Sequence, residues 1–412
     1  MPISTSQILD VLHQYGINPL DDTYAQAELP TIGEIAEDEE VYNTSLSEVL
    51  GRDDDAEVED PFDIFDLDDP RLREWQGQLR EIIDTRTSGN WPIGGPLDGL
   101  PVHPVEQPEP RCAWYCPIHF FGQSWGIYIR EDCILSHAHH IAAFVDWPSV
   151  RLPPRILERH LLRSAFYVFF LHEQFHHKVE SLGFRMLVTT GADRYRPYKV
   201  RVYRPKLLTS DCIEESLANA ESYRRLTEER YTKRVHPAIR KGLRDYLRWS
   251  IPQQPPGYRE GLKFLSETPY RDGLHYLQSQ VLDAKHPPTT PKAHWSVAPN
   301  MITSLADISR DIYVVLPKGA RPIFNPTTID PGATVSSMEM ERALTKHYGY
   351  KRVHGGKGSH VKLAKPGEKP VILPSNQRTL SRDIVKGILR DFGEYPISRV
   401  RDLVDGKLPV HG

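Results

Sequence analysis

Residues 166–180 read FYVFFLHEQFHHKVE and place His172 and His176 four positions apart, with Glu173 directly after the first histidine. The pair Pro153-Pro154 precedes this stretch and indicates the start of a long helix, which we expect to end near Gly183. Residues four apart share one face of a helix, so both imidazoles can face a single ion. The turns before His172 are apolar nearly all round, which predicts a buried helix. Burying these polar groups is costly unless a metal or a partner satisfies them.

The HExxH spacing predicts a zinc site with His172 and His176 as ligands. Glu173 would lie beside the open coordination position, where its carboxylate can take a proton from zinc-bound water and return it to a leaving amine. The alternative interpretation is a structural helix whose histidines are satisfied by neighbouring side chains. A third ligand is needed, and CIEESLANAESY (residues 212–223) supplies Glu214 and Glu215 on a second predicted helix.

Together these motifs resemble the ImmA/IrrE-type minimal gluzincins, in which a glutamate four residues before the Asn of an E-x-x-A-N-x-x-A stretch completes the HExxH zinc site. The resemblance covers about residues 110–220. It implies a mainly helical zincin-like domain with a small antiparallel sheet, zinc as cofactor, and a peptide or protein substrate. It also implies Glu215 as the third ligand, with Glu214 as the alternative, and Asn219 as a supporting residue behind the ligands.

Other stretches could contribute to the same region. WGIYI (residues 125–129) predicts a strand, either an edge strand on which a peptide is laid or an ordinary core strand. Cys112, Cys116 and His119 have a spacing that could begin a zinc site, but no second cysteine pair follows, which favours strand packing. The histidines of SHAHH (residues 136–140) either line the cleft or belong to a turn.

Composition limits the setting of the protein. Its four cysteines are too few and too scattered to predict a disulfide framework. No apolar run reaches the roughly 18 residues that suggest a membrane-spanning helix, and the N-terminus lacks a signal-peptide pattern. We therefore expect a cytoplasmic protein without a membrane segment.

Charge is distributed unevenly over the 412 residues, whose net charge is −4. Residues 34–69 hold 16 acidic residues and one basic residue, and the rest of the chain has a net charge of +11. We expect an N-terminal helix within 1–30, an acidic and mostly disordered segment at 31–70, and a metallopeptidase-like domain at 71–285. A proline-rich linker with one strand, DIYVVLPKG, follows at 286–335, and a basic domain occupies 336–412.

The basic domain contains MERALTKHYGYKRVHGGKGSHVKLAKPGEKPVILPSNQRTLSRDIVKGILRDFG, residues 340–393. This stretch resembles the HicA family of toxin ribonucleases in its first helix ending in Gly-Tyr, its Gly-Ser-His, its Pro-Gly turn, its apolar strand and its last helix. The resemblance implies an α–β–β–β–α fold similar to double-stranded-RNA-binding domains, an antitoxin partner, and cleavage of RNA by His360.

The residues around His360 suit that chemistry. Cleavage of RNA by its own 2′-hydroxyl needs a base with a pKa near neutrality and cations beside the phosphate, and no metal. His360 supplies the base, and Lys351, Lys357 and Lys362 supply positive charge. The alternative is a nucleic-acid-binding module without cleavage.

The whole sequence therefore predicts a prokaryotic toxin or phage-defence effector that joins a zinc metallopeptidase-like domain to a HicA-like ribonuclease. The rival interpretation is a regulatory or sensor protein with an inactive zincin fold and a nucleic-acid-binding C-terminal module. We further predict that residues 34–69 restrain the ribonuclease as an RNA mimic and that proteolysis within 286–299 releases it. The alternative is that the two domains are independent, or that a separate antitoxin restrains the ribonuclease.

Overall fold

The computed structural model describes residues 3–19, 35–36, 38–46, 49, 70–88, 112–284, 302–320, 323, 335–353, 360–374, 380, 382–393 and 399–408. Contacts divide the chain into two compact units, the first built from residues up to Phe324 and the second from Asn325 onward. Each unit has a hydrophobic core of its own. Among the described helices, none combines the length and hydropathy that crossing a bilayer requires.

A four-stranded mixed sheet lies in the first unit, with the strand order β1-β4-β3-β2. The two outer pairs are antiparallel, whereas the central strands β3 and β4 run parallel. The expectation of a purely antiparallel sheet is therefore wrong. The strand expected at WGIYI is β3, which has a neighbour on each side, so the edge-strand interpretation is wrong and the alternative, an ordinary core strand, is confirmed. The bounds are β1 (Glu39–Thr44), β2 (Ala113–Cys116), β3 (Gly126–Arg130) and β4 (Ile312–Pro317).

Two of these strands come from segments expected to lie outside any domain. The strand β1 belongs to the acidic segment 31–70, and β4 belongs to the expected linker 286–335. Ile312, Val314 and Leu316 of β4 are buried, because a run that is apolar on both faces suits the middle of a sheet. Glu39 of β1 pairs with Arg130 of β3, which offsets one of the acidic charges. Most of residues 34–69, and all of 286–299, lie outside the described residues.

The N-terminal helix α1 (Thr5–Gln14) is part of the first unit. Ser4 and Gln7 form a capping box at its start. Its side chains Ile8, Leu9 and Leu12 are buried in the core of that unit. The apolar spacing of these residues predicts the helix, and their burial shows that it docks onto the sheet and helices rather than forming a domain of its own.

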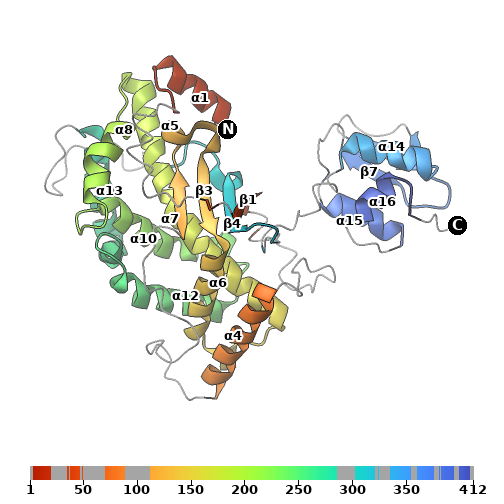
Figure 1. Cartoon of the computed structure of the whole chain (residues 1–412), viewed down its shortest axis with the longest axis horizontal. Coiled ribbons are helices and arrows are strands. Elements are labelled where there is room, and N and C mark those ends of the chain that lie inside the picture. Colours follow the sequence, from red (N-terminus) through yellow and green to blue (C-terminus); the bar gives the residue numbers. More distant parts are fainter. Residues whose placement is uncertain are drawn as a thin grey trace. The chain divides into compact units, whose positions relative to one another are not determined.

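Helices make up most of the first unit (Figure 1). The long helix α7 contacts strands β2 and β3 of the sheet and also contacts α10 and α13, so it connects the sheet to the helical part of the unit. The α-helices are α4 (Pro70–Thr87), α5 (Ile118–Phe121), α6 (Glu131–Ala143), α7 (Pro154–Thr190), α8 (Tyr195–Tyr198), α9 (Arg204–Lys206), α10 (Ile213–Arg224), α11 (Glu229–Thr232), α12 (Pro237–Ser250) and α13 (Glu267–Leu282).

The helix α7 runs past Gly183, where we expected it to end. A Cβ atom at position 183 would lie 2.6 Å from the Cβ of Tyr195, so this glycine allows close packing rather than a turn. The helix ends instead before Gly191, which adopts a φ of +68° and donates its N–H to Leu187 O at 2.8 Å. Both roles require a residue without a side chain, and the sequence alone does not distinguish them.

Two of the four cysteines form a disulfide, contrary to our expectation. Cys112, just before β2, is bonded to Cys133 in α6. The other two, Cys116 and Cys212, are buried free thiols. The two bonded cysteines are 21 positions apart in the sequence, but their Cα atoms lie only 5.5 Å apart. They are close because β3 pairs with β2 and so brings the start of α6 back to the start of β2.

The described residues of the second unit form a three-stranded antiparallel sheet with the order β5-β6-β7 and three helices. The helices α14 and α15 and the three strands follow the expected α–β–β–β–α order, and a short helix α16 comes after them. Leu363, Leu373 and Leu389 belong to the shared core. The bounds are α14 (Ser337–His347), β5 (Lys351–Val353), β6 (His360–Ala364), β7 (Val371–Pro374), α15 (Arg382–Asp391) and α16 (Val400–Val404).

Candidate metal centre and nucleic-acid face

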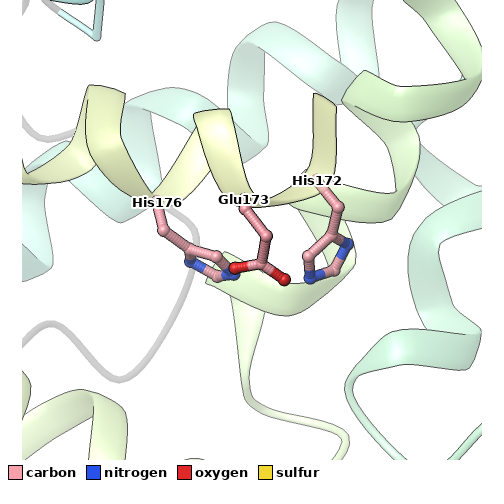
Figure 2. A group of neighbouring side chains, drawn as sticks. All are labelled: His172, Glu173 and His176. Carbon is pink, nitrogen blue, oxygen red and sulfur yellow. The ribbon is translucent and has the colours of Figure 1, made fainter. Parts of the chain in front are cut away.

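The helix α7 presents His172, Glu173 and His176 side by side (Figure 2). One potential ligand atom from each residue lies within 4.8 Å of those of the other two. Glu173 and His176 are only 5% and 6% exposed. The i, i+4 spacing accounts for this arrangement, since both imidazoles come from one face of one helix.

The helix α10 brings Glu215 to the same place. Its Oε2 lies 3.1 Å from Nε2 of His172 and 3.6 Å from Nε2 of His176. Ligands bonded tetrahedrally to zinc at 2.0–2.1 Å lie about 3.3 Å from one another. The separations of Glu215 Oε2 from the two Nε2 atoms are thus close to the separation between ligands of one zinc ion.

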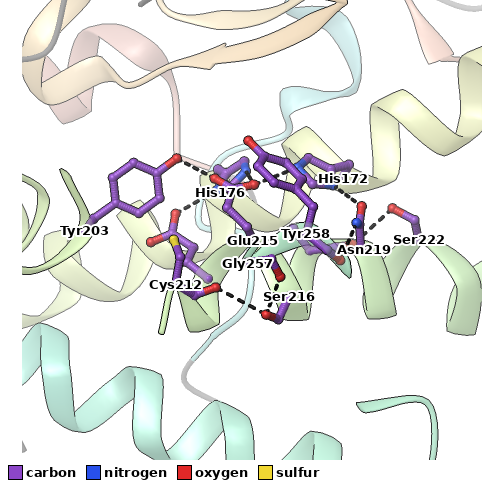
Figure 3. Close-up of polar contacts among 12 residues, drawn as sticks. His172, His176, Tyr203, Cys212, Glu215, Ser216, Asn219, Ser222, Gly257 and Tyr258 are labelled. Carbon is purple, nitrogen blue, oxygen red and sulfur yellow. Dashed lines mark hydrogen bonds and ion pairs between the residues drawn. The ribbon is translucent and has the colours of Figure 1, made fainter. Parts of the chain in front are cut away.

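Each histidine uses its other ring nitrogen to contact a side chain of α10 (Figure 3). Nδ1 of His172 lies 2.9 Å from Oδ1 of Asn219, and Nδ1 of His176 lies 2.6 Å from Oε1 of Glu214. Donation of Nδ1–H to these oxygens leaves Nε2 as a lone-pair atom facing the Glu215 carboxylate. In a neutral imidazole this Nε2 lone pair could bind a cation that Glu215 also holds, whereas a protonated His176 donates from both ring nitrogens, to Glu214 and to Glu215.

Asn219 is itself held in one orientation. Its Nδ2 donates to Oε1 of Gln254 at 2.7 Å and to the backbone oxygen of Tyr258 at 2.9 Å. The amide oxygen is therefore directed at His172. The ring of Tyr258 also stacks on the His172 ring, with centroids 5.8 Å apart and planes 7° apart. Both contacts fix the direction of the imidazole.

Glu214 and Glu215 of α10 occupy different surroundings. Glu214 accepts hydrogen bonds from His176 and from Tyr198, whose hydroxyl is 2.6 Å away, and Lys199 lies 3.7 Å from it. Burial alone would raise the pKa of Glu214, but Lys199 and these hydrogen bonds lower it. Glu215 instead faces both Nε2 atoms, and the Tyr203 hydroxyl donates to its other oxygen. This geometry places Glu215 with the potential ligands and Glu214 behind His176.

The buried charged groups around these residues include His176: burial alone would lower the pKa of its imidazole, but Glu215 and Glu214 raise it to about 10. Glu173, Glu214 and Glu215 are at most 5% exposed, and Lys199 beside them is also 5% exposed. Burial raises the pKa of the Glu173 carboxyl. His176 and Lys199 offset the charges of Glu214 and Glu215, so charge balance alone does not call for a metal, but two imidazoles and a carboxylate are a donor set that can bind zinc.

A cavity of about 220 Å³ opens beside the candidate metal centre. His172, Glu173, Asn219 and Tyr258 line it on the side of the centre. Its other walls come from α6, α7 and α12, and His137 and His140 of the SHAHH stretch are among them. These two histidines therefore line the same cavity, as one of the two interpretations of that stretch held.

A second polar cluster lies farther along α7 and escaped the sequence reasoning. Glu180 accepts from Nδ1 of His119 at 2.6 Å and from the Tyr115 hydroxyl, which also lies 2.9 Å from Nδ1 of His177. All four side chains are buried. The cluster joins α7 to β2 and α5 and leaves His119 outside any metal site. Only the tertiary fold brings its members together, since they lie up to 65 positions apart.

In the second unit, His360 lies exposed on β6. Directly opposite residues of an antiparallel pair share a face, so the register places Val353, Lys362 and Ile372 on one face of the sheet. His360 lies on this face too, two residues before Lys362, and so does Lys351, two residues before Val353. The core of the unit occupies the other face, with Val361 and Leu363 among its residues. We call His360, Lys351, Lys362, Val353 and Ile372 the open sheet face. Lys357 lies outside the described residues.

Comparison with known proteins identifies the second unit. Residues 337–394 match the family model described as the HicA toxin of bacterial toxin-antitoxin systems. This match confirms the HicA domain that the motifs predict. No curated protein and no solved structure matches the chain significantly.

Proposed function

We propose that the chain is a two-site hydrolase in which a zinc peptidase centre in the first unit accompanies a toxin-type ribonuclease in the second. The observation that carries the first half is the convergence of His172 Nε2, His176 Nε2 and Glu215 Oε2, with both Nδ1 atoms engaged by α10. The alternative is a structural helix in which a protonated His176 donates to Glu214 and Glu215. The HicA match supports the second half.

In this proposal His172, His176 and Glu215 hold zinc, and Asn219 and Glu214 orient the two imidazoles. Zinc, when bound, would act as a Lewis acid that acidifies a water molecule and polarises a peptide carbonyl. Glu173, whose pKa is raised by burial, takes the proton of the attacking water and passes it to the leaving amine. The substrate is a peptide or protein segment that enters the cavity.

On the open sheet face, His360 takes the proton of the RNA 2′-hydroxyl as that oxygen attacks the adjacent phosphate. Lys351 and Lys362 stabilise the charge that develops on the phosphate, and Lys357 is proposed for the same role. The toxin-antitoxin match supports a protein antitoxin as a further partner. We place this effector in the cytoplasm, where RNA and an antitoxin would be available to it.

Elemental analysis tests the metal centre. The purified full-length protein should carry about one zinc per chain, and His176→Ala should remove most of it because only two protein ligands remain. His13→Ala, an exposed histidine of α1, is the control and should leave the zinc content unchanged. Equal zinc in all three proteins would remove His176 from the metal site.

RNA cleavage by the full-length protein tests the second site. His360→Ala should reduce the rate about 10²–10⁴-fold, as loss of a general base does. His347→Ala, at the end of α14, is the control and should cleave at the wild-type rate. Cleavage should persist in EDTA. If His360→Ala cleaves RNA at the wild-type rate, His360 is not the base, and if the wild-type protein binds RNA without cleaving it, the alternative of a nucleic-acid-binding module without cleavage gains support.

A further inference from the structure

The wall of the cavity away from the metal centre is aromatic and uncharged. Phe169 of α7, His137 of α6 and Tyr246 of α12 contact one another, with His137 4.6 Å from Phe169 and 5.5 Å from Tyr246 between ring centroids. Trp249 extends the row, 6.3 Å from Tyr246. Val168, Leu247 and Ile251 complete the apolar lining. We call this wall the aromatic pocket.

The aromatic pocket carries no formal charge at neutral pH. Burial, followed by the neighbouring His140, lowers the pKa of His137 to about 3, so its ring is neutral. Burial raises the pKa of Tyr246, so its phenol stays protonated. The polar residues that line the rest of the cavity, Ser250 and Gln253 among them, are also uncharged. The one acidic residue in the lining is Glu173, at the metal centre.

The position of the aromatic pocket ties it to the reacting bond. Phe169 lies three residues before His172 and four before Glu173, so it occupies the same face of α7 one turn away. The cavity volume of about 220 Å³ is smaller than the roughly 300–1,000 Å³ of sites that enclose a whole drug-sized ligand. Such a volume suits one side chain of a longer substrate.

We propose that the aromatic pocket binds the side chain next to the scissile bond and selects large uncharged side chains, aromatic ones above all. This inference rests on the proposed zinc centre. An aromatic ring gains from burial and from edge or stacked contacts with Phe169, Tyr246 and Trp249. A carboxylate or an ammonium group would lose its hydration without meeting a partner.

Binding of amino-acid hydroxamates tests the pocket without requiring turnover, because the hydroxamate group binds zinc and the side chain then reports on its surroundings. The titrations use zinc-loaded full-length protein and compare the hydroxamates of phenylalanine, leucine, glycine, aspartate and lysine. The phenylalanine compound should bind about 10- to 100-fold more tightly than the glycine compound, as burial of one aromatic side chain predicts. The aspartate and lysine compounds should bind no more tightly than glycine.

Three variants test whether the aromatic pocket causes the preference for phenylalanine. Trp249→Ala should remove most of the preference for phenylalanine, whereas Tyr276→Ala, a half-buried aromatic residue of α13 outside the cavity lining, should keep it. Gln253→Lys changes an exposed lining residue, so folding should be preserved, and it should strengthen binding of the aspartate compound.

The outcomes separate the two proposals. If zinc binds and all five hydroxamates have equal affinity, the aromatic pocket is overturned while the metal centre stands. If the protein binds no zinc, the metal centre is overturned and the pocket with it. A preference for phenylalanine that survives in Trp249→Ala would also overturn the assignment to this wall.

Discussion

The two histidine sites of the chain differ most in exposure. His176 is 6% exposed, enclosed between α7 and α10, and its two ring nitrogens face separate carboxylates. His360 is exposed on a strand whose other face covers the core. A metal site needs several residues held in fixed directions, which requires burial and supporting hydrogen bonds. A site for RNA must admit a long charged strand, which requires an open surface.

The comparison predicts that substitutions of supporting residues have larger effects at the enclosed site than around the open one. Glu173→Gln should have an effect as large as that expected for His360→Ala, and larger than those of the supporting residues Glu214 and Lys362. It should slow peptide hydrolysis about 10²–10⁴-fold, since the proton acceptor is lost while the shape is kept. Zinc content should stay at the wild-type value. Cleavage of unfolded casein and elemental analysis provide the two measurements.

Gln174→Ala is the matched control for that experiment. Gln174 is the next residue of α7, and its side chain accepts a hydrogen bond from Arg225 at 2.7 Å. This variant should cleave at nearly the wild-type rate. If Glu173→Gln cleaved casein as fast as Gln174→Ala, Glu173 could not be the base.

Glu214→Gln should have an intermediate effect. The substitution weakens the acceptor for Nδ1–H of His176 and removes a charge, and loss of such a supporting partner typically lowers metal affinity about 10–100-fold. Competition with a fluorescent zinc chelator measures the change. Glu229→Gln, an exposed residue of α11, should leave the affinity unchanged. An unchanged affinity in Glu214→Gln would mean that the enclosed site does not depend on its outer contacts.

Lys362→Ala should have the smallest effect, a reduction of a few-fold in RNA affinity. Loss of one phosphate contact should also lower the slope of log affinity against log salt by roughly 0.7–0.9. Fluorescence anisotropy of a short single-stranded RNA measures the affinity and its salt dependence. The measurement uses the His360→Ala background, in which the RNA is not cut. Lys346→Ala, exposed on α14, is the control. If Lys362→Ala lowered RNA affinity by as large a factor as Glu214→Gln lowers zinc affinity, the expected difference between the enclosed and the open site would be wrong.

Local patterns predicted much of both sites. The i, i+4 spacing placed His172 and His176 together because a helix fixes that relation by itself. The resemblance to gluzincins indicated Glu215 and Asn219, and the geometry brings both to the two histidines. The HicA motifs lie within one continuous stretch, so the order of helices and strands around His360 followed from the sequence.

Contacts between distant segments could not be predicted. Tyr203 and Tyr258 approach Glu215 and His172 only after α7, α10 and the turns between them have packed. The apolar run of β4 indicated a strand, but a strand does not specify its neighbours, and so its place between β1 and β3 was missed. The disulfide between Cys112 and Cys133 depends on the same packing.

The position of β4 has a consequence for synthesis on the ribosome. This strand is central in the first sheet, yet it is translated after the whole helical part of the unit and shortly before the toxin domain. The first unit cannot close its sheet until residues 312–317 have left the ribosome, and pairing across so long a stretch is slow. Translation order therefore places every residue of the first unit ahead of the HicA domain, so a nascent chain that stops early lacks the HicA domain rather than the unit that precedes it.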